Sequence, residues 1–170
     1  MPRRLTLPLA FLVLALVGAG GSAHAAPAAP AFRAKLLDSS TTLDSRDLLG
    51  KKVIVVRFQA SWCKPCARES EALSRLAERY RDRGVEVIAF HVQDSAADAR
   101  RFMRAHKVAY HVALDPHLAV GNRFGASGTP YTVVIDKKGE IVARISGVSA
   151  VSKLPRILDS ALAARPSRKL

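Results

Sequence analysis

Residues 53–66 read VIVVRFQASWCKPC, and this stretch decides the fold. Its first four residues form an uninterrupted β-branched run, which predicts a strand buried on both faces of a sheet. Apolar residues then recur at i, i+3, i+4 and i+7 over residues 73–80, which predicts an amphipathic helix over residues 63–81. The sequence therefore predicts that Cys63 and Cys66 lie in the first turn of a helix that follows a buried strand.

The position of the two cysteines predicts thiol chemistry. A helix N-terminus carries unpaired N–H groups and a partial positive charge, and both favour a thiolate. We expect Cys63, at the mouth of the helix, to be the exposed attacking thiolate and Cys66, one turn further in, to be the buried resolving thiol. Lys64 adds a nearby positive charge, and Pro65 suits a first helical turn because its missing N–H is not needed there. We expect both to contact substrate.

Two other interpretations of the Cys-x-x-Cys motif stay open. Half of a zinc site would need two more ligands, but the chain has no third cysteine, and His106 and His111 lie far along the sequence. A purely structural disulfide is possible in an exported protein, although so short a ring adds little chain-entropy stabilisation. We expect no metal and no cofactor.

The rest of the sequence alternates strands and helices. The predicted strands are 85–92, 131–135 and 140–146, with a turn at 137–139, and the predicted helices are 95–106, 115–124 and 152 onwards. A strand-helix-strand unit of this length requires a parallel, right-handed crossover. The closing hairpin then gives an α/β sandwich with a mixed central sheet and helices on both faces.

Three stretches carry a family resemblance: VIVVRFQASWCKPCARE at 53–69, GVEVIAFHVQD at 84–94 and GTPYTVVIDKKG at 128–139. The chain resembles thioredoxin-fold proteins and, more narrowly, the exported thiol-disulfide oxidoreductases of the ResA/TlpA/DsbE group. The resemblance covers about residues 31–164. It implies a thioredoxin-like three-layer sandwich and a protein-disulfide oxidoreductase, which we expect to be a monomer.

The resemblance also implies roles for further residues. Thr129–Pro130 would be a cis bond facing the cysteines, with backbone that pairs with the substrate segment around the attacked sulfur. Glu69 matches an active-site acid of the group and would exchange a proton with Cys66, one helical turn away; alternatively, it only complements the helix dipole. Trp62 would either shield the disulfide and contact substrate or simply pack beneath the loop.

The sequence departs from the family pattern at three positions. Arg57 stands where thioredoxins carry a buried Asp and this group often has Asn. An inward-pointing arginine needs a carboxylate partner; the alternative is that its head leans out into water. Gln59 replaces a usual Trp, and Glu71 a common Pro. These changes affect the expected redox potential and partner choice and leave the expected fold unchanged.

The N-terminal residues predict export. Residues 1–25 combine a basic start, an apolar run and a small-x-small cleavage pattern ending at Ala25. The run is shorter than the ~20 residues that cross a bilayer as a helix, so we expect a cleaved signal peptide, with an uncleaved anchor as the alternative. The expected divisions are a signal at 1–25, a linker at 26–30, the thioredoxin-like domain at 31–164 and a basic tail at 165–170.

The composition narrows the possible classes of partner. The 170 residues are 49% apolar, as in an ordinary globular protein, and 27 Lys and Arg against 14 Asp and Glu give a net charge of +13. The basic residues are scattered and an exported protein rarely meets nucleic acid, so we expect no nucleic-acid binding. A solvated basic surface is the main interpretation, and docking to anionic lipid or an acidic partner is the alternative.

These features together predict a periplasmic or otherwise exported enzyme that exchanges dithiol for disulfide with protein substrates. The resemblance favours a reductant in the style of cytochrome c maturation, acting on apocytochrome c and reset by a membrane or periplasmic redox partner. Lys64 and Arg57 instead favour a more oxidising pair, which leaves a disulfide oxidase or isomerase open. A copper carrier on the same scaffold and a thiol peroxidase are further alternatives, disfavoured by the Cys-x-x-Cys spacing and by the lack of a peroxidatic motif.

Overall fold

The computed structural model of the chain describes residues 26–37 and 39–164. In chain order the elements are β1 (Arg33–Lys35), β2 (Thr42–Asp44), the 3-10 helix η1 (Ser45–Leu48), β3 (Val53–Gln59), α1 (Lys64–Arg81), β4 (Val85–Val92), α2 (Ala96–Ala105), β5 (His111–Asp115), α3 (Ala119–Phe124), β6 (Tyr131–Ile135), β7 (Ile141–Ser146) and α4 (Ala150–Ala163).

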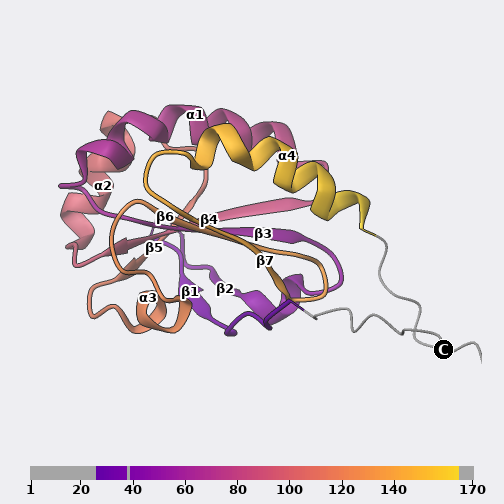
Figure 1. Ribbon diagram of the computed structural model, residues 1–170. Helices are drawn as coiled ribbons and strands as arrows, with labels where there is room; N and C mark the ends of the chain where they lie inside the picture. The colour runs from indigo at the N-terminus through magenta and orange to yellow at the C-terminus, as the bar shows by residue number, and fades with distance from the viewer. Residues whose placement is uncertain (1–25, 38, 165–170) are drawn as a thin grey trace, which may run out of the picture.

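The central sheet has five strands in the order β5-β4-β3-β6-β7 (Figure 1). Strands β3, β4 and β5 are parallel, whereas β6 is antiparallel to β3 and β7 is antiparallel to β6. Helix α1 makes the crossover from β3 to β4 that parallel neighbours require. The mixed sheet with helices on both faces confirms the predicted thioredoxin-like sandwich.

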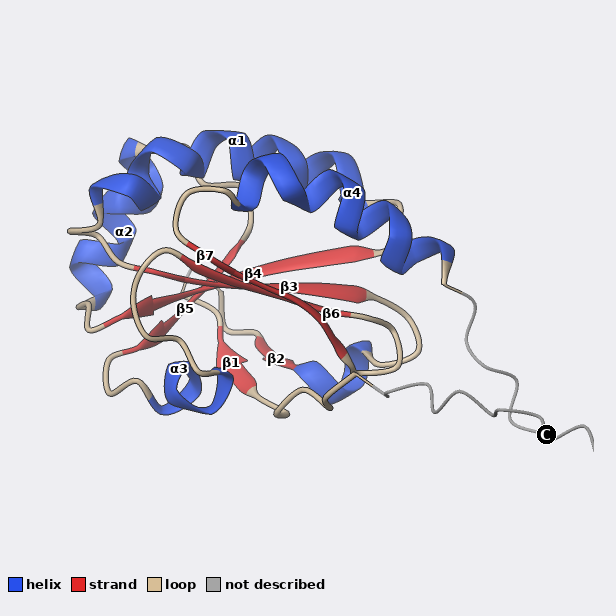
Figure 2. Cartoon of the chain, in the orientation of Figure 1, coloured by secondary structure: helices blue, strands red, loops and turns tan. Residues whose placement is uncertain are grey.

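The two faces of the sheet carry separate cores. Helices α1 and α4 cover one face (Figure 2), and the β1–β2 hairpin with α2 and α3 covers the other. Because side chains alternate along a strand, Val53 and Val55 of β3 pack under α1 and α4. Arg57 and Gln59 continue that row, so the two polar residues of β3 lie on the α1 side. Every residue of β3 is buried, which confirms the prediction for residues 53–56 and extends it to residues 57–59.

Some elements differ from the sequence prediction. The strands β1, β2 and β5 were not predicted. Strands β1 and β2 have only three residues each, and the five residues of β5 lack the β-branched run that marks β6. Helix α3 begins at Ala119 and not at Asp115. The carboxylate of Asp115 instead accepts the N–H groups of Val120 and Gly121, at 3.1 and 2.7 Å, at the start of that helix.

Residues 26–30, expected to be a linker, are tied to the domain. The N–H of Ile141 donates to the carbonyl of Pro27, and the N–H of Ala29 donates to that of Gly139, both at 2.8 Å. These bonds cover the start of the edge strand β7 and satisfy its backbone groups. Gly139 has φ of +85° in the tight turn that joins β6 to β7.

The expected signal peptide and basic tail lie outside the described residues. Within residues 26–37 and 39–164, no helix is long and apolar enough to cross a membrane.

Candidate active site

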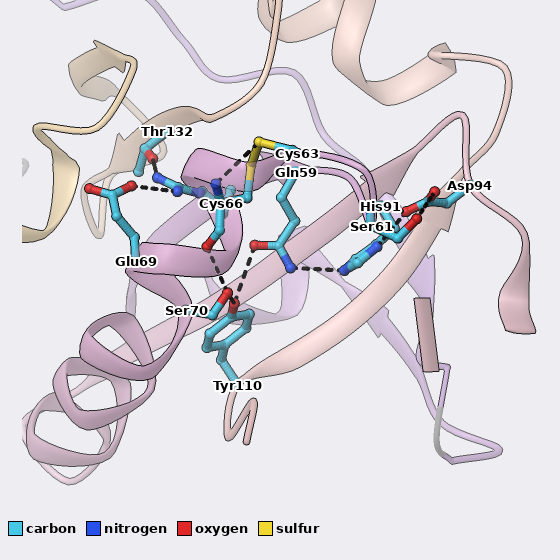
Figure 3. Close-up of a disulfide and its surroundings, with 11 residues drawn as sticks. Gln59, Ser61, Cys63, Cys66, Glu69, Ser70, His91, Asp94, Tyr110 and Thr132 are labelled. Atoms are coloured by element: carbon cyan, nitrogen blue, oxygen red, sulfur yellow. Dashed lines mark hydrogen bonds and ion pairs between the residues drawn. A yellow bond between two sulfur atoms is a disulfide. The ribbon is translucent and has the colours of Figure 1, made fainter. Parts of the chain in front are cut away.

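A disulfide joins Cys63 and Cys66 at the N-terminus of α1 (Figure 3). Their Cα atoms are 5.2 Å apart. Cys63 is the N-cap of α1, and its Sγ accepts the N–H of Cys66 at 3.2 Å. The preceding turn is closed by the N–H of Cys63, which donates to the carbonyl of Ala60 at 3.1 Å. The sulfur of Cys63 therefore occupies the position in which a helix favours a thiolate.

The exposure of this segment differs in part from the prediction. In the disulfide form Cys63 is only 3% exposed, so the expectation of an exposed Cys63 is corrected, because its neighbours cover most of the disulfide. Cys66 is deeper, with 0% exposed. Trp62 is 61% exposed, which excludes simple packing beneath the loop. Lys64 is exposed and Pro65 half-buried on the first turn of α1.

The Thr129–Pro130 bond is cis, as the resemblance implied. Strand β6 begins at Tyr131, opposite Phe58 near the end of β3. Pro130 therefore lies at the edge of the sheet from which β3 enters the cysteine loop. Pro130 is buried and Thr129 half-buried.

Arg57 points inward and is 1% exposed. Its Nη2 donates to Oε2 of Glu69 at 2.6 Å, and its Nη1 donates to Oγ1 of Thr132 at 3.0 Å. Thr132 is its cross-strand neighbour on β6, and Glu69 comes from α1. Arg57 thus has the carboxylate partner that an inward arginine requires. In the described part of the chain its Nε has no hydrogen-bond partner.

Glu69 is 9% exposed, and its carboxylate forms an ion pair with Arg57. It lies beyond the first turn of α1, and the dipole effect falls off within that turn. The interpretation of Glu69 as a mere complement to the helix dipole is therefore weakened. No pattern in the sequence linked Arg57 with Glu69, whereas the structure shows that the two side chains form an ion pair.

A second buried polar group lies on the β4 side of the disulfide (Figure 3). Gln59 and His91 face each other across β3 and β4, and the Nε2 atoms of the two side chains are 2.8 Å apart. His91 Nδ1 lies 2.7 Å from Oδ2 of Asp94. The carboxylate of Asp94 accepts the backbone N–H of Ser61 at 2.6 Å and its hydroxyl at 2.7 Å.

The same chain of hydrogen bonds returns to the cysteine helix through Tyr110. The hydroxyl of Tyr110 donates to Oε1 of Gln59 at 3.2 Å and lies 3.5 Å from Oγ of Ser70. Ser70 in turn donates to the carbonyl of Cys66 at 2.9 Å. We call the six residues that link the loop to the helix the polar chain: Ser61, Asp94, His91, Gln59, Tyr110 and Ser70.

Burial shifts the pKa values of two residues of the polar chain, His91 and Tyr110. Burial lowers the pKa of His91 below its ordinary 6.5, and this effect outweighs the opposing hydrogen bond and charge of Asp94. Burial likewise raises the pKa of Tyr110 above 10, against the hydrogen bonds of Ser70 and Gln59. Both side chains are therefore neutral at neutral pH. Across the described ranges, no group of three or more His, Cys, Asp or Glu side chains is arranged to hold a metal ion.

Comparison with known proteins places this geometry in a family. The family model described as Redoxin matches residues 24–159. The chain belongs to the redoxin family. The redoxin is 29% identical to a thiol-disulfide oxidoreductase ResA of Bacillus cereus over 117 residues, which are 69% of this chain and 67% of that protein. It is 31% identical to the thiol:disulfide interchange protein HelX of Rhodobacter capsulatus over 143 residues, 84% of this chain and 79% of HelX.

A solved structure agrees in fold. The thiol:disulfide interchange protein of the thioredoxin family from Chlorobium tepidum TLS superimposes with a TM-score of 0.72, over 81% of this redoxin and 97% of that chain, at 24% identity. Against two other ResA proteins of Bacillus, the matched region spans 64% of the relative. This redoxin is thus a thiol-disulfide oxidoreductase of the ResA/TlpA/DsbE group.

Sequence reasoning did not identify the polar chain of this redoxin as part of the site. His91 and Asp94 belong to the stretch 84–94 that carries the family resemblance, but no spacing rule links them to Gln59. The strand register that pairs Gln59 with His91 is the missing information. The replacement of the usual Trp by Gln59 was the available signal, because a buried amide requires polar partners.

Proposed function

We propose that this redoxin reduces disulfides in other exported proteins, with Cys63 as the nucleophile and Cys66 as the resolving thiol. The N–H of Cys66 is directed at Sγ of Cys63 at 3.2 Å, at the N-terminus of α1, and this observation carries the assignment of Cys63 as the nucleophile. After reduction of the internal disulfide, that sulfur has the hydrogen-bond donor and the helix dipole that favour a thiolate. Cys66 lies deeper, with 0% exposed against 3% for Cys63, and is bonded to the sulfur of Cys63. The ion pair that compensates the charge of Arg57 supports the net direction.

The exchange proceeds in two balanced steps. The Cys63 thiolate attacks one sulfur of a substrate disulfide, forms an intermolecular disulfide and releases the first substrate thiolate. Cys66, after losing its proton, attacks Sγ of Cys63, restores the Cys63–Cys66 disulfide and releases the second substrate thiolate. Two electrons pass from the dithiol to the substrate, and its two thiolates take up two protons.

The ion pair of Arg57 supports reduction as the net direction. An unpaired buried cation under the cysteines would favour the thiolate form and make the couple more oxidising, because a strong oxidant is one whose reduced form is stabilised. Glu69 compensates the charge of Arg57 at 2.6 Å. Of the two cationic residues that favoured an oxidising pair, only the exposed Lys64 retains that argument.

Glu69 is the proposed acceptor of the Cys66 proton in the second step. It follows Cys66 by three residues, within one turn of α1, and Arg57 binds its Oε2. Glu69→Gln should slow the release of the mixed disulfide more than the initial attack, and quenched-flow trapping can separate the two rates. If Glu69→Gln released the mixed disulfide as fast as the unmodified protein does, Glu69 would not have this role.

The substrate surface is proposed to consist of Trp62, Lys64, Pro65 and the Thr129–Pro130 segment. A hollow of about 310 Å³ lies beside Trp62, and its lining includes Phe102 of α2. A substrate side chain next to the attacked cysteine fits there while the substrate backbone pairs along Pro130. The resemblance to the ResA/TlpA/DsbE group supports apocytochrome c as the substrate.

Export and recycling complete the proposal. The signal pattern of residues 1–25 supports a periplasmic location, either free or anchored by an uncleaved segment. Each turnover leaves the Cys63–Cys66 disulfide oxidised, so a membrane or periplasmic dithiol partner must reduce it again. The redoxin is proposed to act as a monomer.

The equilibrium potential of the Cys63–Cys66 couple, measured against glutathione, tests the direction. A value near −270 mV supports a reductant, and a value near −120 mV would overturn it in favour of an oxidase. Cys66→Ser should accumulate mixed disulfides through Cys63, and Cys63→Ser should accumulate none. Isolation of those adducts from an exported fraction identifies the substrate, and adducts without cytochrome would overturn the proposed substrate.

A further inference from the structure

We propose that Asp94 is a positioning residue for the cysteine loop, residues 60–63. Asp94 fixes this loop through Ser61, and His91 in turn holds Asp94. The inference rests on the proposed exchange at Cys63 and adds a residue to it. The hydrogen bonds of Asp94 go to Ser61 and His91, so it acts on Cys63 through the backbone of the cysteine loop.

The contacts of Asp94 fix one residue of the loop in two ways. Oδ2 accepts the backbone N–H of Ser61 at 2.6 Å, and Oδ1 accepts its hydroxyl at 2.7 Å. A charged acceptor makes such hydrogen bonds short and strong. Ser61 directly precedes the exposed Trp62 and lies two residues before Cys63. A single carboxylate thus holds the loop where it presents its indole to a substrate.

The carboxylate of Asp94 is itself held by the sheet. The amide nitrogen of Gln59 can only donate, so Nε2 of His91 is the acceptor in their 2.8 Å contact. His91 therefore carries its proton on Nδ1 and donates it to Oδ2 of Asp94 at 2.7 Å. His91 and Gln59 are fully or almost fully buried on paired strands. The position of Asp94 is thereby fixed relative to the paired, buried strands β3 and β4.

The polar chain also reaches the far side of the disulfide. Gln59 accepts from Tyr110, which lies within 3.5 Å of Ser70, and Ser70 donates to the carbonyl of Cys66. Hydrogen bonds thus connect both ends of the Cys-x-x-Cys segment to the strands β3 and β4. In the resolving step Cys66 must reach Sγ of Cys63, and a fixed relative position shortens that search. We therefore expect Asp94 to matter most in resolution.

Charge and position have opposite effects here, and this makes the inference testable. A carboxylate near the loop disfavours the Cys63 thiolate by repulsion, whereas its hydrogen bonds hold the loop for reaction. Asp94→Asn removes the charge and can keep the contacts, since the amide oxygen accepts from Ser61 N–H and His91 while its NH₂ donates to the Ser61 hydroxyl. Asp94→Ala removes both the charge and the contacts.

The experiment compares these two variants in the full chain, with Asp136→Ala as a matched control. Asp136 is also a buried aspartate whose carboxylate accepts backbone N–H groups, those of Lys138 and Glu140 at 2.9 Å, but it lies in the β6–β7 turn. Trp62 is the single tryptophan of the chain, so its fluorescence anisotropy reports the loop directly. The second readout is the rate at which Cys66 resolves a mixed disulfide formed with a thionitrobenzoate probe.

We expect Asp94→Ala to lower the Trp62 anisotropy and to slow resolution about tenfold or more. Asp94→Asn should restore both values to within about twofold of the unmodified protein on the same geometric argument. Asp136→Ala should change neither. If Asp94→Ala left the anisotropy unchanged, or if Asp94→Asn behaved like Asp94→Ala, the positioning role would be overturned.

Ser61→Ala keeps the test decisive if Asp94→Ala does not fold. It removes only the hydroxyl contact and should lower the Trp62 anisotropy by a smaller amount; an unchanged anisotropy would contradict the inference. The proposed function fails separately. An unmodified protein that does not exchange with the probe would refute the exchange reaction, whereas the anisotropy would still decide whether Asp94 holds the loop.

Discussion

Two polar residues of β3, two positions apart, bind their surroundings in different ways. Arg57 forms a charged group with Glu69 of α1 and Thr132 of β6. Gln59 forms a neutral amide contact with His91 of β4 and Tyr110. Both lie under α1, close to the disulfide. Arginine stays charged over the physiological pH range, whereas histidine can gain a proton. One side of the disulfide therefore carries a buried, paired cation, and the other side carries a buried histidine.

The comparison predicts that breaking the charge pair has the largest effect on stability. Glu69→Ala leaves Arg57 buried without its counter-ion and should lower the free energy of unfolding by about 3–5 kcal/mol. Urea denaturation of the oxidised protein measures this. The double variant Arg57→Met/Glu69→Leu should recover most of the loss, because it removes both charges and fills the space. A double variant no more stable than Glu69→Ala would show that the pair does not act as a charge pair.

Breaking the polar chain should lower the free energy of unfolding by less than breaking the charge pair does. Gln59→Ala leaves Nε2 of His91 and the hydroxyl of Tyr110 without their shared partner and should lower the free energy of unfolding by about 1–3 kcal/mol. The same urea titration applies. A loss as large as that of Glu69→Ala would contradict the distinction between the two groups.

His91 of the polar chain should also make stability depend on pH. The pKa of His91 is lowered in the folded protein, so the unfolded chain takes up the proton first as pH falls. His91 therefore stabilises the fold above pH 6.5, and that contribution is lost as pH falls below 6.5, with a slope of at most about 1.4 kcal/mol per pH unit. Urea midpoints between pH 7.5 and about 5 measure the slope.

His91→Asn should flatten this dependence, and His117→Asn, at an exposed position, should leave it unchanged. An unchanged slope in His91→Asn would assign the pH dependence to another group.

The smallest effect is expected at Glu71, two residues beyond Glu69 on the same helix. Its carboxylate lies 2.5 Å from Arg75, but both side chains are exposed. Glu71→Ala should lower the free energy of unfolding by about 0.3–0.5 kcal/mol, and by less in high salt. If Glu71→Ala matched Glu69→Ala, burial would not be what distinguishes the two ion pairs.

The fold could be predicted from the sequence where patterns are local. The Cys-x-x-Cys motif between a β-branched run and an amphipathic stripe defined β3 and α1, and Gly139 marked the hairpin turn. The orientation of Arg57 could not be predicted in this way, because β3 is buried on both faces and alternation cannot tell which face a polar residue takes. The expected carboxylate partner was present in the sequence as Glu69, but nothing local linked the two.

The polar chain was even harder to predict from local sequence patterns. Ser61, Asp94 and Tyr110 come from three different loops, and they meet only because β3, β4 and β5 pair in one particular register. A hydrogen-bond chain of this kind is a property of the tertiary structure. The short strand β5 was missed as well, although its position brings Tyr110 to the site.

The pairing of residues 27–29 with the β6–β7 hairpin limits how the enzyme can sit at a membrane. Those residues join the sheet at the end of β6 that lies opposite the start of β3, whereas the cysteines follow the other end of β3. Seven residues of β3 span roughly 23 Å at about 3.3 Å each. A leader retained as an anchor would therefore enter the domain at the end of the sheet opposite the cysteines. The reactive sulfur would lie about one strand's length from that point of entry.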